Sequence, residues 1–588
     1  MSRSTQNQRL VRINTVLGKD ALIVQSVQGA QIMSEGFRYT LDVYSDALDA
    51  IAGDKLIGTN ATFIVMNDGG KPINYNGFIT QMSALGLSKD RATLSYRITL
   101  ESGLFFLTKQ TDCRIFQEKT IPDILGIVLK PLINGGFIKY KPALSGAHNE
   151  KRFIVQYNET NDAFFKRLCR LENIAFYFTM DNGSHTLKLI DNIGACETIS
   201  EPIRFQPHTM AHDHLDTWSQ HSRFVTGAYA QRTYNYKQAS QGIMPTSEKT
   251  SGDKSKLTHS QQSESYLFNE DYNTLADGKQ HLKRTMDKAT ERQRFFQGGG
   301  DCRFLNVGQH FRIKPVPEGP KLASPDETYT TTRVELSASV LGGKVRNSLE
   351  AVPKGDLVYP QGEKPVIHSM QTATVTGPDG SEIYTDKYGR IKVRFHWDRN
   401  DDVSGQDRTC YLRVMQAMAG PNMGAQFTPR IGDEVVISFA NGDPDRPFVS
   451  GSLHHPEHLP PYSSHNGTRN GIRTRSTKGG SVANCNELYF EDTKGKEEVY
   501  LQAEKDHSVY VKNDQKIKID NNKSQHVIKN ESNKVDGNYT INVGKQLLVE
   551  AGQKIVLKVG GSSITITGSK IDISSSKVDV NGGKIELN

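Results

Sequence analysis

Hydrophobic and polar residues alternate along parts of the N-terminal third, which is the pattern of β-strands that bury one face. One such stretch begins at Phe37 and a second at Ala92. Their apolar positions are Phe37, Tyr39, Leu41 and Val43 in the first and Ala92, Leu94, Tyr96, Ile98 and Leu100 in the second. Both stretches predict strands of a barrel or of a half-buried sheet.

Helical spacing appears in the segment that follows. Its apolar residues are Phe164, Phe165, Leu168 and Leu171. Three of them recur at intervals of three or four residues, as one face of an amphipathic helix requires. Residues 158–161 offer N-cap side chains, and Asp162 suits the positive end of the helix dipole. The pattern therefore predicts a helix that starts near residue 161.

Residues 386–451 predict a compact central module of short strands. Two segments alternate within it, DKYGRIKVRFHWD (386–398) and PRIGDEVVISFANGDPDRPFVSG (429–451). The expected inward residues are Ile391, Val393, Phe395, Trp397, Val435, Ile437 and Phe439, and the outward ones are Arg390, Lys392, Arg394 and His396. GDPDRP supplies a turn, because Pro fixes φ and Asp can bond its own backbone. A small β-barrel fits about seventy residues of this kind.

Three segments interrupt these patterns. Residues 239–267 are rich in Ser, Gln, Lys and Thr and predict a mobile excursion. Residues 314–324, rich in Pro and Gly, predict another weak point. Pro, Gly and Lys around residues 352–364 predict a joint between the large N-terminal region and the central module.

The most regular pattern is a ladder of apolar-polar-apolar triplets from about Val499 onward. Early triplets recur mostly every eight residues and the last few every seven. Their apolar residues are Val509, Val511, Ile517, Ile519, Ile541, Val543, Leu547, Val549, Ile555, Leu557, Ile564, Ile566, Ile571, Ile573, Val578, Val580, Ile585 and Leu587. A coiled coil needs apolar residues at i and i+3 or i+4, whereas these stand at i and i+2. The ladder therefore predicts short strands joined by turns.

A single repeat of the ladder cannot fold alone. Burying two branched side chains contributes roughly 3–6 kcal/mol, whereas fixing eight residues of backbone costs on the order of 8–16 kcal/mol. Stacked repeats of one chain would still leave strand edges open. Several copies that share one core would close those edges, and a single-chain β-solenoid that closes its own core is the alternative.

Composition narrows the class of protein. With 588 residues the chain should form two to four domains. Its net charge of +7 is mild, and Lys and Arg alternate with acids, which argues against a nucleic-acid partner. The six cysteines are scattered and predict reduced thiols, with no metal site.

The start of the chain bears on localisation. Residues 1–9 are polar, no signal-peptide h-region follows, and no run is long enough to span a bilayer. We expect assembly in the cytoplasm and, if the protein is exported, secretion without a signal peptide.

The candidate catalytic residues form the segment HHPEH, with His454, His455, Glu457 and His458. Zinc proteases need H-E-x-x-H on a helix, and Pro456 excludes that helix. We expect a solvated loop, and the roles of the three histidines stay open. We expect His212 and His214 to occupy polar positions in a strand or a loop.

Two further sets of residues have a structural interpretation. The glycines 298–300 and 342–343 lack the ending of a phosphate loop and predict turns. The outward row of Arg390, Lys392 and Arg394 lacks interleaved aromatics for base stacking and predicts a solvated face or a subunit contact. No catalytic, cofactor-binding or metal-binding residue is expected.

Several longer segments together resemble the VgrG family, the spike proteins of type VI secretion, which are similar to contractile phage tail hubs and spikes. The central module carries part of the resemblance, as do NGTRNGIRTRSTKGG (466–480) and NELYFEDTKGKEEVYLQAEKD (486–506). RIFQEKTIPDILGIVL and QYNETNDAFFKRLCRLENIAFYF resemble the hub. Met418 and Met423 stand where relatives often carry tryptophan, and Ile174 where a glycine is expected.

The resemblance implies a mainly β protein in four regions: a phage-tail-hub-like region of β-barrel-like domains with a few helices (1–380), an OB-type barrel (381–455), a linker and neck (456–498), and an intertwined β-prism or β-helix needle (499–588). It implies a homotrimer, with the ladder residues as the trimer core. Its expected partners are an Hcp-type tube ring at the hub, a PAAR-type tip protein at the C-terminal end, baseplate components and effector cargo.

The function that these expectations support is mechanical, not enzymatic: the spike at the tip of a contractile injection tube, which punctures envelopes and carries effectors. The linker between barrel and ladder is too short for a glycosidase domain with two positioned carboxylates, and the ladder runs to Asn588 without a catalytic extension. A cell-wall hydrolase, a glycan-binding adhesin and the spike of a prophage-like particle remain as alternatives.

Overall fold

The computed structural model describes residues 4–586 except for 48, 68, 89–92, 207–212, 238–242, 250–255, 269–271, 273, 315–326, 341–342 and 466. Contacts divide the chain into two units, Met1–Glu504 and Lys505–Asn588. In the described residues strands far outnumber helices, as the sequence predicts. No helix among them is both long and apolar enough to cross a membrane.

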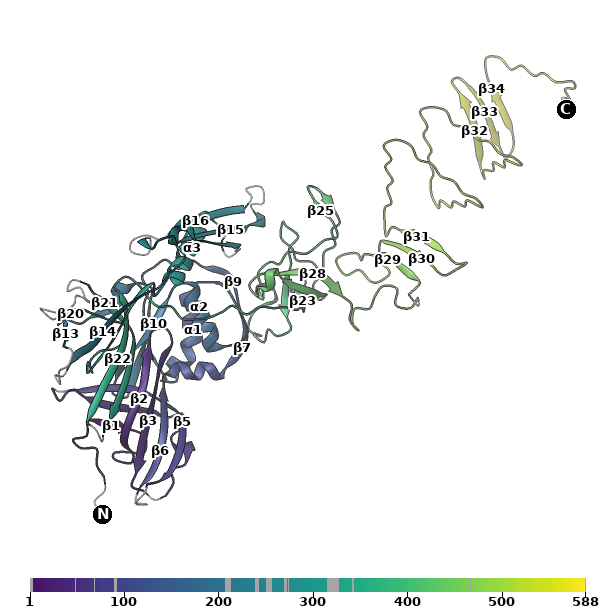
Figure 1. The fold of residues 1–588 in the computed structure, drawn as a ribbon. Helices are drawn as coiled ribbons and strands as arrows, with labels where there is room; N and C mark the ends of the chain where they lie inside the picture. The colour runs from purple at the N-terminus through teal and green to yellow at the C-terminus, as the bar shows by residue number, and fades with distance from the viewer. Residues whose placement is uncertain are drawn as a thin grey trace. The chain divides into compact units, whose positions relative to one another are not determined.

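One sheet of fourteen strands dominates the described part of the first unit (Figure 1). Its N-terminal strands are β1 (Val11–Asn14), β2 (Ile23–Ile32), β3 (Gly36–Ser45), β4 (Asn60–Met66), β5 (Pro72–Leu87) and β6 (Leu94–Glu101). Its later strands are β12 (Glu197–Thr198), β13 (Ile203–Phe205), β14 (His214–Ser222), β18 (Arg294–Gly300), β19 (Gln309–Phe311), β20 (Ile313–Lys314), β21 (Tyr329–Ser339) and β22 (Lys344–Pro353). The two groups join where β2 pairs antiparallel with β21, with Ser26 opposite Ser339.

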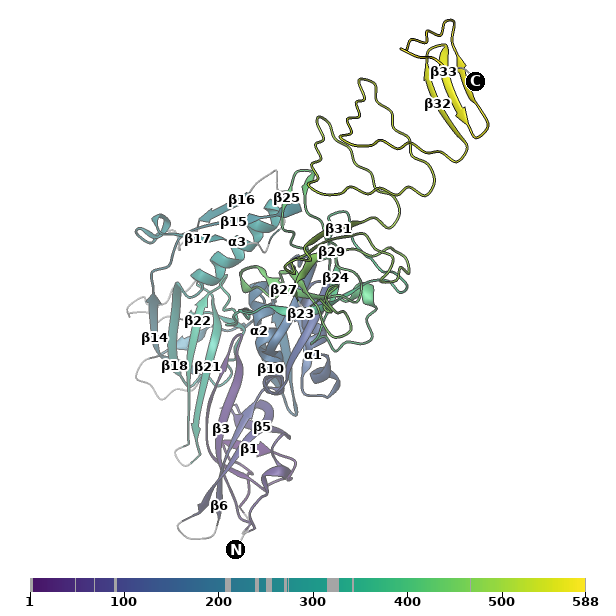
Figure 2. The same cartoon turned by 90° about the vertical axis from the view of Figure 1, so that its right-hand side faces the viewer.

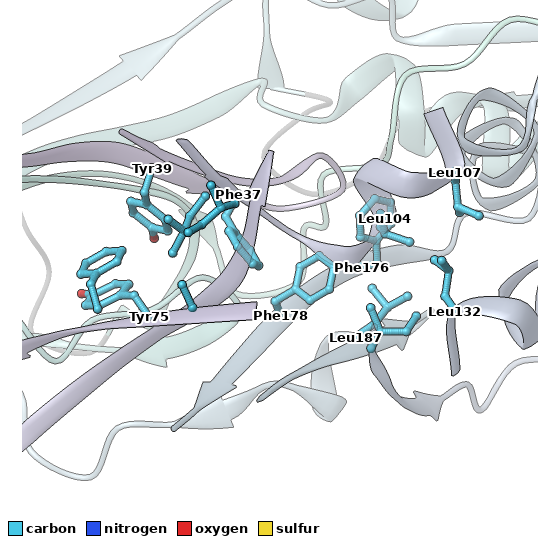
Figure 3. Packing of buried hydrophobic residues seen from close by; sticks show 14 of the residues in the cluster. Phe37, Tyr39, Tyr75, Leu104, Leu107, Leu132, Phe176, Phe178 and Leu187 are labelled. Carbon is cyan, nitrogen blue, oxygen red and sulfur yellow. The ribbon is translucent and has the colours of Figure 1, made fainter. Parts of the chain in front are cut away.

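Both predicted N-terminal strands are confirmed. β3 buries Phe37, Tyr39, Leu41 and Val43, and β6 buries Tyr96, Ile98 and Leu100. Ala92 lies outside the described residues. Figure 3 shows Phe37 and Tyr39 of β3 in the core, together with side chains of β10 (Ala175–Asp181) and β11 (Ser184–Ile190). Phe37 meets Phe178 edge to face, with ring centroids 5.2 Å apart.

The predicted helix is α2 (Asn161–Leu171), and Thr160 is its N-cap. Ile174 is fully buried after this helix, and the preceding Asn173 adopts a positive φ of 55°. Asn173 therefore provides the left-handed position for which a glycine was expected, because asparagine tolerates that conformation.

Two helices were not predicted from periodicity. α1 (Ile121–Asn134) starts with a capping box in which Thr120 and Asp123 satisfy each other's backbone N–H groups. α3 (Leu275–Thr290) is capped by Thr274 and packs on β16. The 3-10 turns are η1 (Gly53–Lys55), η2 (Gly103–Lys109), η3 (Ile193–Ala195), η6 (Ser260–Gln262), η7 (Gly405–Asp407) and η8 (Ala440–Gly442).

The excursion predicted for residues 239–267 is wrong for the residues that the structure describes. β16 (Ile243–Lys249) and β17 (Glu264–Phe268) both pair with β15 (Ala228–Tyr234). The composition misled because strands at a surface carry polar side chains while their backbone groups are paired. Lys314 ends β20, and the rest of the weak point at 315–324 lies outside the described residues.

The glycines at 298–300 are not a turn but the end of strand β18, between β14 and β22. A side chain at Gly298 would collide with the Trp218 ring, and one at Gly300 would collide with the His214 carbonyl. Glycine is needed for this close approach of backbone and ring. Gly343 does lie in a turn, with φ of 60°, and Gly342 is outside the described residues.

The central module is a four-stranded sheet in the order β24-β23-β27-β28. Its strands are β23 (Gln371–Thr376), β24 (Lys392–Phe395), β27 (Glu434–Phe439) and β28 (Pro447–Leu453), with a hairpin of β25 (Ala419–Gly420) and β26 (Met423–Gly424) nearby in sequence. Ile391, Val393, Phe395, Val435 and Ile437 are buried as predicted, and Trp397 and Phe439 pack against them while partly exposed.

Arg390 does not face solvent, although the sequence predicts that it belongs to the outward row. Only 7% of its surface is exposed. The guanidinium donates to Asp386 Oδ2 over 2.8 Å and to the Tyr236 hydroxyl over 2.6 Å. The side chain leaves the strand face because an ion pair and a tyrosine from a distant segment are within its reach. His396 is exposed, and Lys392 and Arg394 are half-buried.

A two-stranded ribbon packs on the central module, which is called the barrel below. It consists of β7 (Thr111–Lys119) and β9 (Lys151–Thr160). Phe153 and Val155 of β9 are buried in the barrel's own apolar cluster. The Val155 backbone N–H donates to Asp445 Oδ1 over 2.6 Å, and Arg152 donates to the Tyr411 carbonyl over 3.0 Å. The barrel is thus covered by a segment from the N-terminal third.

Three smaller sheets complete the described strands. The first joins β10, β11 and β8 (Lys139–Ala143). The second, here called the neck sheet, consists of β29 (Arg469–Arg473), β30 (Glu487–Glu491) and β31 (Glu498–Gln502). The third lies in the second unit and consists of β32 (Lys554–Val559), β33 (Ser562–Thr567) and β34 (Ile571–Ser574), as Figure 2 shows for β32 and β33.

Candidate assembly surface

One face of the β32–β33–β34 sheet is mostly apolar. Ile566 lies opposite both Ile555 and Ile571, and Ile564 lies opposite both Leu557 and Ile573. Residues directly opposite each other in antiparallel strands point to the same side of the sheet. The six side chains therefore form two rows of three on one face, called the apolar grid below.

Within the described residues most of the apolar grid is uncovered. Ile566 is 36% exposed and Ile571 is 64% exposed, although both are pure hydrocarbon. Contiguous exposed apolar patches of this kind mark sites of association. The open edges of the sheet also present unpaired backbone N–H and C=O groups, which favour pairing with further chains.

The rest of the ladder is exposed as well, but the structure does not bring it together. In the described part of residues 505–553 there is neither helix nor strand, and every residue is exposed. The predicted core residues that lie outside any described strand are Val509, Val511, Ile517, Ile519, Ile541, Val543, Leu547, Val549, Val578, Val580 and Ile585. Leu587 lies outside the described residues.

Paired charges follow the ladder beside its apolar residues. Lys570 Nζ lies 2.7 Å from Asp572 Oδ2, and Lys577 Nζ lies 2.8 Å from Asp579 Oδ2. Asp572 stands opposite Thr565 across β33 and β34, on the side of the sheet away from the grid. Asp572 therefore lies on the polar side of β34, whereas Lys577 and Asp579 lie outside the described strands.

These charged pairs were missed in the sequence, although a signal exists. Lys570, Lys577 and Lys584 recur at seven residues, and an acid follows each of them by two positions. The pattern K-[IV]-[DE] thus specifies both faces of a repeat, the apolar side and the ion-paired side. Because the pairs are exposed, each contributes little to stability.

The HHPEH segment forms an exposed turn after β28, as its prolines predict. The rings of His455 and His458 stack with centroids 4.5 Å apart, and His454 Nδ1 lies 3.1 Å from the His458 carbonyl. Within the described residues no three His, Cys, Asp or Glu side chains gather as a metal would require. His214 begins β14 and is buried, and His212 lies outside the described residues.

A buried ionic network joins α3 to residues of the N-terminal third of the chain. Glu172, whose side chain is fully buried, accepts from Lys151 over 2.8 Å and from Arg284 over 2.6 Å. His148 bridges Glu172 and Asp191 at 3.1 Å from each. Burial alone would raise the pKa of Glu172, but the hydrogen bond from His148 and the charges of Lys151 and Arg284 lower it to about 2. The positive groups around Glu172 therefore favour its ionised form.

Three protein families match successive parts of the chain. The phage tail baseplate hub matches residues 31–341, the type VI secretion system/phage-baseplate injector OB domain matches residues 371–454, and the bacteriophage T4 gp5 C-terminal trimerisation domain matches residues 470–580. The third match contains the apolar grid and the neck sheet except for its first residue, Arg469.

Curated relatives agree with these families. The type VI secretion system spike protein VgrG1b of Pseudomonas aeruginosa is 31% identical over 87% of this chain and 69% of its own length. VgrG1a of the same organism is 30% identical over 86% of this chain and 79% of its own length. The actin cross-linking toxin VgrG1 of Vibrio cholerae is 28% identical over 85% of this chain, which spans 46% of that protein.

Solved structures share the fold. A type VI secretion component of E. coli, described as structurally similar to the T4 tail proteins gp27 and gp5, has a TM-score of 0.52 at 18% identity and covers 75% of this chain and 100% of its own. A Francisella PdpA-VgrG complex has a TM-score of 0.55 at 10% identity and covers 84% of this chain and 87% of its own. At these identities the likeness concerns the fold alone.

Proposed function

Because the chain belongs to the VgrG family of type VI secretion system spike proteins, we propose that three copies wrap their C-terminal ladders about a common axis into a rigid needle. The observation that carries the proposal is the apolar grid, which a single chain leaves exposed. A homotrimer would bury all its rows in one core. The predicted trimer-core residues would then be hidden, including those from Val509 to Val549 and from Val578 to Leu587.

The work of the needle is mechanical. Contraction of a sheath would push a tube, the hub would receive the load, and the barrel would pass it to the spike. Support comes from the β7–β9 ribbon, since Phe153 and Val155 from the N-terminal third are buried in the barrel's cluster. A joint with a shared apolar core transmits force better than a flexible linker.

The regions would divide this work as the sequence suggested, namely hub (1–380), barrel (381–455), linker and neck (456–498) and spike (499–588). We move one strand between regions: β23 (Gln371–Thr376) pairs with β24 and β27 and belongs with the barrel. The hub would dock on an Hcp-type tube ring, and the C-terminal end would carry a PAAR-type tip protein. Baseplate components and effector cargo complete the proposed partners.

Assembly would take place in the bacterial cytoplasm, with export through the injection machine and without a signal peptide. The chain itself would be a carrier, not an enzyme. Support for this division comes from the relatives matched over most of this chain, which are named as spike proteins.

The test replaces two grid residues in the full chain, Ile555→Asp together with Leu557→Asp. Buried unpaired carboxylates oppose assembly, so the purified variant should be monomeric and export of the tube protein should stop. The matched control is Val556→Asp together with Lys558→Asp, which adds the same two aspartates to the other face of β32. A wild-type chain that ultracentrifugation shows to be a stable monomer would refute the proposal.

A further inference from the structure

The neck sheet has two unlike faces. Cross-strand pairing places Ile472 opposite Leu488, Leu488 opposite Leu501, and Phe490 opposite Val499. All five side chains therefore lie on one side of the sheet. They are exposed in the single chain, from 37% for Leu488 to 70% for Val499. The fold thus contains a second uncovered apolar face, on residues that precede the ladder.

The opposite face of the neck sheet is occupied by its own chain. The rings of Tyr489 and Tyr500 stack with centroids 4.8 Å apart, and the Arg469 guanidinium lies 4.1 Å from the Tyr489 centroid. Arg473 pairs with Glu487 over 2.7 Å, and Tyr462 packs at the edge of Tyr489. Side chains of the same chain therefore cover this face, so the apolar face is the one available for a further chain.

The ladder has a weakness that a trimer must overcome. Lys570 to Ile573 reads KIDI, the next repeat reads KVDV at 577–580, and the last reads KIEL at 584–587. A chain that slips by seven residues would still place an apolar pair on the axis and a Lys and an acid on the outside. Repeats of this kind specify register only weakly, because the slipped alignment loses one repeat at the end.

The neck sheet does not repeat. Its apolar face carries one aromatic side chain, Phe490, and four branched aliphatic side chains that come from all three strands. A slipped alignment would leave Phe490 without the neighbours that suit its volume, and packed cores penalise such changes by one to several kcal/mol. The segment that the trimerisation domain matches begins at residue 470, inside β29, and continues into the ladder.

From this geometry we propose that the neck sheet packs its apolar face against the same face of two further copies of this chain and thereby sets the register of the three ladders. The inference rests on the trimeric spike proposed above and names the element that aligns it. Folding of the neck trimer would come first, and the ladders would then pair from a defined starting point.

The experiment uses the full chain and reads register directly. Two ladder variants, Ile573→Cys and Val580→Cys, are co-expressed, oxidised and digested, and the disulfide-linked peptides are identified by mass spectrometry. Ladders in register bring each position to its own copies, so only 573–573 and 580–580 links should form. A slip of seven residues brings position 573 of one chain to position 580 of another.

The neck is then altered in the same background. Phe490→Ser with Leu501→Ser should raise the ratio of mixed 573–580 links to same-position links by about tenfold or more, or release monomers. Phe490→Leu, which keeps the sheet apolar, should give a smaller rise of the same sign. The matched control, Val482→Ser with Leu459→Ser, removes two equally exposed apolar side chains outside the neck sheet and should change nothing.

The results separate the two proposals. A neck variant that stays trimeric with only same-position links, as in the control, would overturn the role of the neck and leave the trimeric spike intact. A wild-type chain that is monomeric would overturn the spike itself.

Discussion

Ile566 lies directly opposite Ile571 across the β33–β34 pair, and both side chains remain exposed on the same face of the sheet. A pair of isoleucines in register has no reason to face water in the assembled protein, since each contributes about 1.5–3 kcal/mol when fully buried. The difference between an exposed and a covered isoleucine is large enough to measure.

Replacing Ile566 tests whether the apolar grid is covered. Ile566→Ala should cost about 2–5 kcal/mol per chain if the side chain is buried by partner copies, and less than about 0.5 kcal/mol if it stays exposed. Thermal unfolding of the full chain measures the difference. Thr565→Ala, on the other side of the same strand, provides the control and should leave the melting temperature of the spike nearly unchanged.

Asp445 should be needed for the contact between ribbon and barrel. Its Oδ1 accepts the Val155 N–H, and Asp445→Ala would leave that buried donor unpaired. The expected cost is about 1–3 kcal/mol of unfolding free energy, read from urea unfolding. Lys364→Met removes the partly exposed ion pairs to Asp443 and Asp445 but keeps the hydrogen bond from Val155, so it should cost less. Equal costs for the two variants would contradict this account.

His185 should make the hub sensitive to acid. The Gly103 N–H donates to His185 Nε2 over 3.0 Å, so Nδ1 carries the proton and donates to Asn76 Oδ1 over 2.8 Å. Burial lowers the pKa of His185 to about 4. The native state thus favours the neutral ring, and its contribution is complete above pH 6.5 and is lost as the pH falls toward 4.

The measurement is urea unfolding at pH 7.5 and pH 5. Wild-type protein should lose about 2 kcal/mol more than His185→Gln between these values, because only the histidine titrates. Identical losses for both proteins would show that His185 is not the group responsible.

Glu172 should be among the most costly charges to remove. Glu172→Gln leaves Lys151, Arg284 and His148 around a neutral amide, and breaking a buried ion pair by removing one partner costs about 3–5 kcal/mol. Unfolding free energy measured at neutral pH tests this. Glu197→Gln is a suitable comparison, because Glu197 is mostly exposed and pairs only with Lys188 among the ion pairs of the described residues.

His148 should make the stability of the protein depend on pH with the opposite sign to His185. Its hydrogen bond to Glu172, and next to it the one to Asp191, raise the pKa of His148 against the effect of burial. The charged ring is favoured in the native state, so its contribution is complete below pH 6.5 and declines as the pH rises through the raised pKa. Wild-type stability should fall above neutral pH, and His148→Gln should remove that fall.

Local patterns predicted the elements whose side chains face one clear environment. β3 and α2 followed from periodicity alone, and the inward row around Ile391 and Val393 marked the barrel. Each has a solvent side and a core side, so the two-residue or 3.6-residue period is visible in the sequence.

Elements that lack one clear solvent side and one clear core side could not be predicted in this way. α3 packs on β16, and β16 and β17 lie in a stretch rich in Ser, Gln, Lys and Thr while their backbones pair with β15. The glycines of β18 resemble a turn in the sequence, yet they make room for Trp218 and for the His214 backbone. For the glycines of β18 the deciding partners lie far away in the chain.

The sequence by itself determined which residues of every spike repeat form its apolar row, because apolar-polar alternation along the chain is visible without knowledge of their partners. Only the tertiary structure decided which elements contact each other: β2 with β21, Phe153 with the barrel, and Trp218 with Gly298. Pairings of that kind depend on distance in space, and residues far apart along a chain carry no local record of it.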